Sequence, residues 1–328
     1  MQTSLKKGIS VLVCSFNGAD RLPQTIAHLA RQVVQENVEW EIILVDNAST
    51  DNTSQVAKGE WKKHRVHHVD FSIVFEPRPG KINALETGTK HCKYEYFIIC
   101  DDDNWLCDSY VQKTYELLEK DPRIGAVGGQ AFPVSDTGVL PEWFDHYKEG
   151  YAVGQQAADK GDVTKRGFVF GAGLGTRTRL YQAAYEKFPS LLIGRQGYKL
   201  SAGEDAEYCQ RLILRNYRLY YEPTLTFKHY LPTHRLQENY RDRLYAGLQD
   251  ADQILETYYM INRFRRKVRH NFLNKARLLI IVPFRILFAR SRNTVNNEMK
   301  LLMYLLDIQS KKDRNFDSIR KFEKTESF

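Results

Sequence analysis

The sequence has few cysteines, no two cysteines in the CxxC spacing, and no long apolar run near its start. Its five cysteines among 328 residues are scattered, which disfavours a disulfide framework or a zinc site and fits reduced thiols in the cytosol. The first seven residues are short of apolar side chains, and the apolar run after them has only the length of a strand. No secretory signal or transit peptide is therefore expected, and we predict a cytoplasmic protein.

Acidic side chains are scarce only at the end of the chain. The formal net charge is +8, but from Met260 onward 17 basic residues face 6 acidic ones, and the preceding part has 31 basic and 34 acidic residues. An acidic partner is therefore expected to meet the C-terminal part. The near-neutral main body disfavours a protein that binds nucleic acid, although the basic, Tyr-rich end keeps that alternative open.

Strand-length apolar runs alternate with helical patterns in the first third of the chain. This alternation predicts an α/β fold with a mostly parallel, twisted sheet that helices flank. Further on we expect a strand over 124–127, helices over 179–187 and 206–216, a loop over 193–203 and helical structure over 235–268. The strands expected in the first third are 9–14, 41–45, 71–75 and 96–100, and the helices are 21–36, 52–62 and 81–90.

Three of the expected strands end in polar residues, most notably in the triplet Asp101-Asp102-Asp103. Ligands of parallel sheets bind beyond the carboxyl ends of the strands. Adjacent carboxylates repel one another, whereas Mg²⁺ prefers carboxylate oxygens and takes its other ligands from water and substrate phosphates. Alternate strand residues share a side, so Asp101 and Asp103 are expected to face one pocket while Asp102 faces away. A solvated acidic turn is the alternative.

Asp46 and Phe16 follow two other strands and are candidates for binding a nucleobase. A carboxylate can accept a hydrogen bond from the base edge, and an aromatic ring can stack on the base. Equally, Asp46 suits a turn or a helix cap, and Phe16 suits ordinary packing.

These motifs, taken together, resemble glycosyltransferase family 2 in order and spacing as far as about residue 216. The resemblance implies a GT-A fold, a nucleoside-diphosphate sugar as donor, Mg²⁺ or Mn²⁺, and inversion at the anomeric carbon. The segments that carry it are Ser15–Gly18, Val45–Asp51, Pro79–Lys81 with Ala84-Leu85, Cys100–Asp103 and Gly203–Asp205.

The resemblance also assigns roles within the predicted site. Asp46 would bind the base, Asp101 would lie near the ribose, Asp103 would reach the metal-bound diphosphate, and Lys81 would contact the nucleotide. The predicted donor-binding residues are Ser15, Phe16, Asn17, Asp46, Lys81, Asp101 and Asp102, and the predicted metal ligands are Asp101, Asp103 and His229. A lone histidine such as His229 is more often structural, which is the alternative for that residue.

Glu204-Asp205 supplies the remaining chemistry that a sugar transfer needs. The acceptor hydroxyl must lose a proton as it attacks the anomeric carbon, and a carboxylate can take it. The family pattern places the base at Asp205, with Glu204 orienting the acceptor. Alternatively, the two residues cap the helix that follows. The nearby glycines 171, 173 and 175 lack the context of a dinucleotide loop, and we expect them to permit a close approach of the backbone to the sugar or acceptor.

The segment 277–288 is apolar, but it is too short, with Arg285 too central, to span a membrane comfortably. Basic residues flank it, so residues 263–292 are expected to meet an anionic membrane surface. A core helix with a basic solvent face is the alternative. Peripheral attachment at the inner face of the membrane would suit a lipid-linked acceptor.

The sequence thus predicts an inverting, metal-dependent hexosyl- or N-acetylhexosaminyltransferase. The donor is expected to be UDP-linked, and the acceptor a saccharide or a lipid-linked saccharide. We predict a catalytic domain over 1–233, with a nucleotide half (1–121) and an acceptor half (122–233), followed by a helical basic region over 234–328. A relative that binds the donor without catalysis is the alternative. A nicotinamide-dependent oxidoreductase is disfavoured, because no glycine fingerprint follows the first strand.

Overall fold

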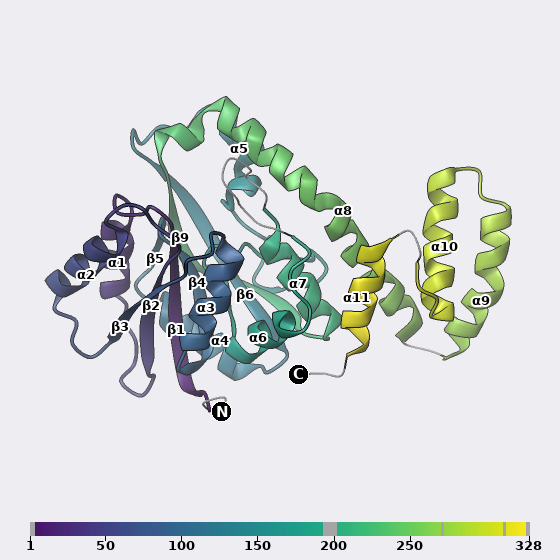
Figure 1. Cartoon of the computed structure of the whole chain (residues 1–328), viewed down its shortest axis with the longest axis horizontal. Coiled ribbons are helices and arrows are strands. Elements are labelled where there is room, and N and C mark those ends of the chain that lie inside the picture. The colour runs from purple at the N-terminus through teal and green to yellow at the C-terminus, as the bar shows by residue number, and fades with distance from the viewer. Residues whose placement is uncertain (1–3, 193–201, 270–271, 311–312, 326–328) are drawn as a thin grey trace. The chain divides into compact units, whose positions relative to one another are not determined.

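Four parallel strands in the order β3-β2-β1-β4 form one half of the central sheet (Figure 1). The computed structural model describes residues 4–192, 202–269, 272–310 and 313–325. Nearly all side chains of β1, β2 and β4 are buried, as expected for strands that helices cover on both faces. The strands are β1 (Lys6–Ser15), β2 (Trp40–Asp46), β3 (Asp70–Phe75) and β4 (Tyr94–Asp101).

The helices of this half are α1 (Leu22–Ala30), α2 (Thr53–His64), α3 (Lys81–His91) and α4 (Tyr110–Lys120). The helix expected over 21–36 ends at Ala30, so that prediction was too long. The backbone N–H of Val33 donates to the carbonyl of Asp108 at 2.7 Å, and this contact with a distant segment replaces a further helical turn. Tertiary pairing therefore outweighs the helical pattern of residues 31–36.

The second half of the sheet mixes strand directions. β8 runs antiparallel to β4 and β6, β6 and β9 are parallel, and β5 and β7 pair antiparallel with β9. The loop predicted over 193–203 lies outside the described residues except for its last two. The strands are β5 (Asn104–Leu106), β6 (Ile124–Ser135), β7 (Gly161–Asp162), β8 (Gly175–Arg177) and β9 (Arg218–Leu231). The helices are α5 (Phe144–Tyr147), η1 (Lys148–Tyr151), α6 (Thr178–Glu186), α7 (Glu204–Leu214) and η2 (Thr233–Leu236).

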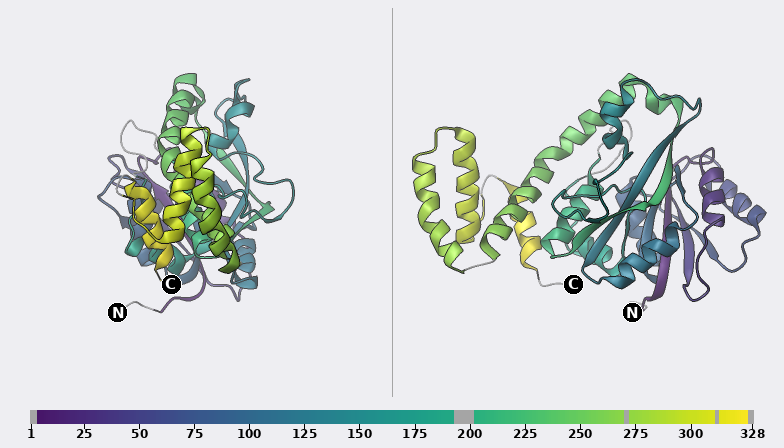
Figure 2. Two further views of the ribbon diagram at one scale, coloured as in Figure 1. Left: turned by 90° about the vertical axis from the view of Figure 1, so that its right-hand side faces the viewer. Right: turned by 180° about the vertical axis from the view of Figure 1, so that it is seen from behind.

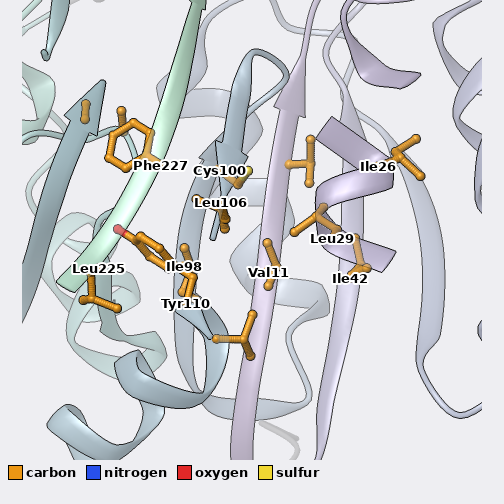
Figure 3. Close-up of a cluster of buried hydrophobic side chains, with 14 of the residues drawn as sticks. Val11, Ile26, Leu29, Ile42, Ile98, Cys100, Leu106, Tyr110, Leu225 and Phe227 are labelled. Atoms are coloured by element: carbon orange, nitrogen blue, oxygen red, sulfur yellow. The ribbon is translucent and has the colours of Figure 1, made fainter. Parts of the chain in front are cut away.

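Two hydrophobic clusters cover the two faces of the sheet. In β1, Val11 belongs to one cluster with residues of α1 and α4 (Figure 3), whereas its neighbour Leu12 belongs to the other cluster with residues of α3, α6 and α7. This alternation is the side-chain period of a strand, and it fixes the register of each strand because a one-residue slip would exchange the faces. Because the register of each strand is fixed, the positions of the polar residues at the strand ends are fixed as well.

The chain divides into two compact units, and the boundary between Asp252 and Gln253 lies within α8 (Glu238–Arg269). The second unit also contains α9 (Phe272–Leu287), α10 (Arg292–Leu306) and α11 (Arg314–Lys324). Helices α9 and α10 lie side by side (Figure 2). Within the described parts of the chain, none of the helices combines the length and the apolarity that crossing a bilayer requires.

Candidate active site

Each carboxylate of the acidic triplet pairs with a cation from a different part of the chain. Asp101 ends β4, and the two residues after it lie in a turn, so the strand alternation expected to place Asp101 and Asp103 on one face does not continue through the triplet. The three carboxylates therefore have three separate surroundings. The ion pairs are Lys81–Asp101 at 2.5 Å, Arg21–Asp102 at 2.9 Å and Arg235–Asp103 at 2.6 Å.

Asp102 is buried, and both of its carboxylate oxygens have partners within the protein. Arg21 donates to the two oxygens at 2.9 Å each, and Ser15 Oγ donates to Oδ2 at 2.6 Å. The side-chain hydroxyl of Thr25 donates to the Asp102 carbonyl at 2.7 Å. Gly18 is required here, because an added Cβ would lie 2.3 Å from Asp102 Oδ2. The sequence predicted Ser15 and Asp102 as donor-binding residues, but these contacts engage both in holding the loops after β1 and β4 together.

Asp103 lies among three side chains that other strands and turns bring to it. Asn104 Nδ2 donates to Oδ1 at 3.0 Å, and His229 Nε2 is 3.5 Å from the same oxygen. The pairing of β5 with β9 places Asn104 opposite His229, and this brings the His229 ring next to Asp103, the residue before Asn104. Burial alone would raise the pKa of Asp103, but His229 and Arg235 outweigh it and hold that pKa well below its usual range. Asp103 is therefore an ionised carboxylate next to an imidazole.

Asp103 and His229 fit a divalent cation as a pair of ligands, although Asp101 does not join them. The Nδ1 atom of His229 is buried without a hydrogen-bond partner, while its Nε2 atom faces Oδ1 of Asp103 at 3.5 Å. An ionised carboxylate and an imidazole nitrogen are both ligands of Mg²⁺ or Mn²⁺ sites. Among the described residues, however, no group of three His, Cys, Asp or Glu side chains is arranged around one point. Any further ligands would have to come from substrate or water.

Arg235 reaches Asp103 from the turn η2, which follows β9. This turn is fixed by Asp136, whose Oδ2 accepts from the backbone N–H of Thr233 at 2.7 Å and from its hydroxyl at 2.8 Å. Arg235 could not be recognised from the sequence, since nothing in its neighbourhood links it to Asp103, which lies 132 residues earlier. Its guanidinium places a fixed positive charge beside the candidate metal ligands.

Asp46 is buried at the end of β2 and accepts hydrogen bonds from its own turn. Its Oδ1 accepts from the backbone N–H of Ser49 at 3.1 Å, and its Oδ2 accepts from Ser54 Oγ. In this state Asp46 has the role of a turn residue, which was one of the alternatives to base binding, and it does not cap α2, whose N-cap is Asn52. Phe16, by contrast, is 55% exposed, so its ring is open to a partner.

Asn17 and Asn47 tie the loops at the strand ends to one another. Asn17 has a left-handed backbone (φ 47°), and its Oδ1 accepts from the N–H of Thr50 at 2.7 Å. Asn47 Nδ2 donates to the carbonyl of Arg78 at 2.6 Å, and Asn47 Oδ1 accepts from the N–H of Gly80 at 2.8 Å. The sequence analysis missed Asn47, whose side chain holds the loop that delivers the lysine of α3.

Lys81 is the first residue of α3 and links the two halves of the site. Burial lowers its pKa, but the ion pair with Asp101 outweighs burial, so the net pKa is raised. Asp205 also contributes to raising it. Lys81 is therefore a permanent cation within electrostatic reach of carboxylates from both halves of the predicted catalytic domain.

Asp205 lies in the first turn of α7 and is held by the backbone of the glycine segment. Its Oδ2 accepts from the N–H of Gly171 at 2.7 Å, and its Oδ1 accepts from the N–H of Ala206 at 2.9 Å. These two backbone donors hold the carboxylate in one orientation. Glu204, the first residue of α7, is half-buried beside it.

The glycines of 171–175 are needed for close packing against protein side chains. A Cβ on Gly171 would lie 2.9 Å from Cβ of Asp205. Gly173 has φ +72°, and a Cβ there would lie 2.4 Å from the hydroxyl of Tyr110, which donates to the Gly173 carbonyl at 2.7 Å. The sequence predicted close approach of this backbone to the sugar or acceptor. The structure shows these two glycines close to Asp205 and Tyr110, and the approach to a sugar or acceptor stays a prediction.

A buried ion pair anchors α7, and the sequence analysis missed it. Arg211 Nη2 lies 2.8 Å from Glu207 Oε1, and their side chains are 2% and 0% exposed. Glu207 also accepts from the N–H of Leu191 at 3.1 Å. Arg211 donates to three carbonyls of the preceding segment, which belong to Ala184, Phe188 and Pro189.

The fold and these strand-end side chains define an α/β enzyme whose sheet and flanking helices resemble the GT-A glycosyltransferases. The chain belongs to glycosyl transferase family 2, whose family model matches residues 10–181. The resemblance seen in the sequence motifs is therefore confirmed.

Known proteins similar to this chain include a synthase and two proteins of solved structure. The poly-beta-1,6-N-acetyl-D-glucosamine synthase of Staphylococcus epidermidis is 32% identical over 123 residues, which are 38% of this chain and 28% of the synthase. The chain thus matches about a quarter of the length of that relative. S. aureus TarS 1–349 in complex with UDP-GlcNAc has a TM-score of 0.50 at 15% identity, with 93% of each chain covered. The mannosyltransferase PcManGT from Pyrobaculum calidifontis, in complex with GDP-Man and Mn²⁺, has a TM-score of 0.50 at 16% identity, covering 98% of this chain and 85% of that one. At these identities the solved structures show a shared fold alone.

Proposed function

We propose that the protein transfers a sugar, with inversion, from a nucleoside-diphosphate sugar to a saccharide or lipid-linked saccharide. UDP-N-acetylglucosamine is the first donor to test, because the S. epidermidis relative is named for a polymer of N-acetylglucosamine and TarS was solved with UDP-GlcNAc. The observation that carries the proposal is the ion pair of Lys81 with Asp101 at 2.5 Å, which joins two candidate donor-binding residues. Asp205 is the last of the charges that raise the pKa of Lys81, which supports a candidate base on the same side of the sheet edge.

Asp205 is the proposed general base. Its carboxylate accepts the proton of the acceptor hydroxyl while the acceptor oxygen forms a bond to the anomeric carbon and the bond to the diphosphate oxygen breaks. The proton remains on Asp205, and the bonding electrons leave with the diphosphate. The N–H of Gly171 donates to one oxygen of this carboxylate and holds it in place. The direction in which the other oxygen points is thereby defined as well. General-base assistance of this kind contributes about 10²–10⁴-fold in rate.

The leaving diphosphate is stabilised by cations already present in the site. Lys81 and Arg235 can each exchange a carboxylate for a phosphate oxygen, which places positive charge where negative charge develops. Asp103 and His229 would hold Mg²⁺ or Mn²⁺, and such an ion would supply Lewis-acid stabilisation of the diphosphate. The complex of PcManGT with Mn²⁺ supports a divalent cation in a protein of this fold.

We propose that the loops after β1 and β2 bind the base of the donor. Phe16 is exposed for stacking, and Asp46 would exchange its contact with Ser49 or Ser54 for the edge of the base. Asn17 shapes this loop through its bond to Thr50. We further propose that the enzyme works at the inner face of the membrane, where a lipid-linked acceptor would be available.

The variant Asp205→Asn tests the mechanism. UDP release from UDP-N-acetylglucosamine, with β-1,6-linked N-acetylglucosamine oligomers as acceptor, should fall about 10²–10⁴-fold. The affinity for UDP with Mn²⁺, measured by calorimetry, should stay within about twofold, because Asn keeps the shape of the side chain. Asp159→Asn, at an exposed position, is the matched control and should change neither quantity. Unchanged turnover in Asp205→Asn would exclude Asp205 as the base. Donor binding without any transfer by the wild type would support the silent relative.

A further inference from the structure

Helix α9 presents a row of large apolar side chains to solvent. Ile280, Phe284, Leu287 and Phe288 are 65%, 59%, 76% and 75% exposed. Their spacing of four, three and one residues places them on one face of the helix. Side chains of this size are seldom left exposed as a group on a soluble protein, so the face calls for a partner.

The opposite side of α9 already has a partner within its own unit. Val282 is fully buried, and Arg285 forms an ion pair with Glu298 of α10 at 3.5 Å. Helix α9 therefore uses one side for packing in the helical unit, while the side that carries Phe284 remains open.

Unpaired cations flank the apolar face. Four acidic side chains of the helical unit form ion pairs with other basic residues: Glu298, Asp307, Asp313 and Glu323. In the part of the chain that the structure describes, four exposed cations near the ends of α9 have no such pair: Lys275, Arg277, Arg290 and Arg292. Positive charge on both sides of an apolar strip complements a surface that is both anionic and apolar.

We propose that this face, which we call the α9 face (Ile280, Phe284, Leu287 and Phe288 with the four flanking cations), docks on an anionic lipid bilayer. The helix has 16 residues and is roughly 24 Å long, so it would lie in the interface with its apolar side chains below the headgroups. A second copy of the chain fits this face less well, because it would bring two sets of cations together. A nucleic acid would leave the apolar side chains without a partner.

The inference deepens the proposed placement at the membrane, but its test does not depend on transfer. Wild-type protein is mixed with vesicles of phosphatidylglycerol or of phosphatidylcholine, and bound protein is measured by flotation at low and at high salt. We expect binding to phosphatidylglycerol alone, and weaker binding at high salt. Phe284→Ser with Phe288→Ser should lower the affinity at least about tenfold, since two large apolar side chains leave the interface.

A charge variant and a matched control separate the contribution of the cations to vesicle binding from the contribution of the apolar side chains. Changing Lys275, Arg277, Arg290 and Arg292 to Gln should remove the preference for phosphatidylglycerol, at a loss of about tenfold or more. The control replaces two equally exposed apolar residues of the first unit, Val33→Ser with Val139→Ser, both 69% exposed in the wild type, and should bind as the wild type does. Thermal unfolding should match among all variants, because the replaced side chains are exposed.

Insertion itself is measured with Phe284→Trp. The natural tryptophans all lie between 40 and 143, so brominated lipids should quench the added one selectively. Three results would overturn the proposal: no quenching of Trp at 284, equal vesicle binding by the Phe284/Phe288 variant, or a dimer in the absence of lipid that this variant dissociates. Sugar transfer to soluble oligomers should be the same in the wild type and the Phe284/Phe288 variant. Loss of transfer would therefore contradict the proposed function, whereas loss of vesicle binding by the wild type would contradict the proposed membrane contact.

Discussion

Removal of Arg211 should destabilise the first unit of the chain more than any surface substitution. Arg211 and Glu207 are 2% and 0% exposed, so Arg211→Met leaves a buried carboxylate without its cation. It also removes the donors of three carbonyl groups between Ala184 and Pro189. Breaking one partner of a buried ion pair costs about 3–5 kcal/mol. In a unit of this size each kcal/mol lowers Tm by about 2–4 °C, so we expect a drop of roughly 10 °C.

The assay is thermal unfolding followed by circular dichroism, with two further variants. Glu207→Leu combined with Arg211→Met removes both charges and should recover part of the loss, because no buried charge is left unpaired. Lys148→Met breaks an exposed pair with Asp145 and should leave Tm within about 2 °C. A Tm for Arg211→Met within about 2 °C of the wild type would refute the reasoning. It would mean that the pair contributes no more than a surface contact.

Two further predictions concern the site, and a third concerns the loop after β3. Gly171→Ala should push the carboxylate of Asp205, the proposed base, aside and lower transfer about 10–100-fold, with nucleotide affinity unchanged by calorimetry. Arg235→Gln should lower Tm without metal but increase the rise in Tm that Mn²⁺ alone produces, because Asp103 loses its resident cation. Glu76 is buried just after β3 and accepts a hydrogen bond from the Arg78 side chain, which lowers the pKa of Glu76 to about 2. Its contribution to stability is therefore complete above about pH 4.5 and is lost as pH falls toward 2. Urea unfolding at pH 6 and pH 3 should show that wild type loses about 2 kcal/mol more than Glu76→Gln does.

The sequence predicted the first half of the fold well because its signals there are local. Val11, Ile42 and Ile98 lie in continuous apolar runs, which need no knowledge of the rest of the chain to be recognised as buried strands. The second half depends on pairings between distant segments. The contact between Asn104 of β5 and His229 of β9 is an example, since a three-residue strand has no pattern of its own.

Only part of the candidate site could be predicted from the sequence, because some of its residues have local signals and others are brought in from distant segments. Asp101 and Asp205 stand out because they follow a strand and precede a helix, and both positions are visible in sequence. The cations that pair with the triplet were less visible. Arg21 and Arg235 look like ordinary surface residues until the fold places them against Asp102 and Asp103. Only Lys81 was identified, and that through the resemblance to the family.

The pairing of Asp101–Asp103 with three cations has a thermodynamic consequence for the order in which ligands arrive. Before any substrate binds, the triplet is electrically balanced, so a divalent cation entering alone would add charge that nothing compensates. A cation that enters together with a diphosphate brings its own counter-charge, and Lys81 and Arg235 are then released to the phosphates. The affinities for metal and nucleotide are therefore expected to be coupled, each tightening the other by the same factor. A titration with the metal ion alone or the nucleotide alone would therefore underestimate the affinity of the protein for the two ligands together.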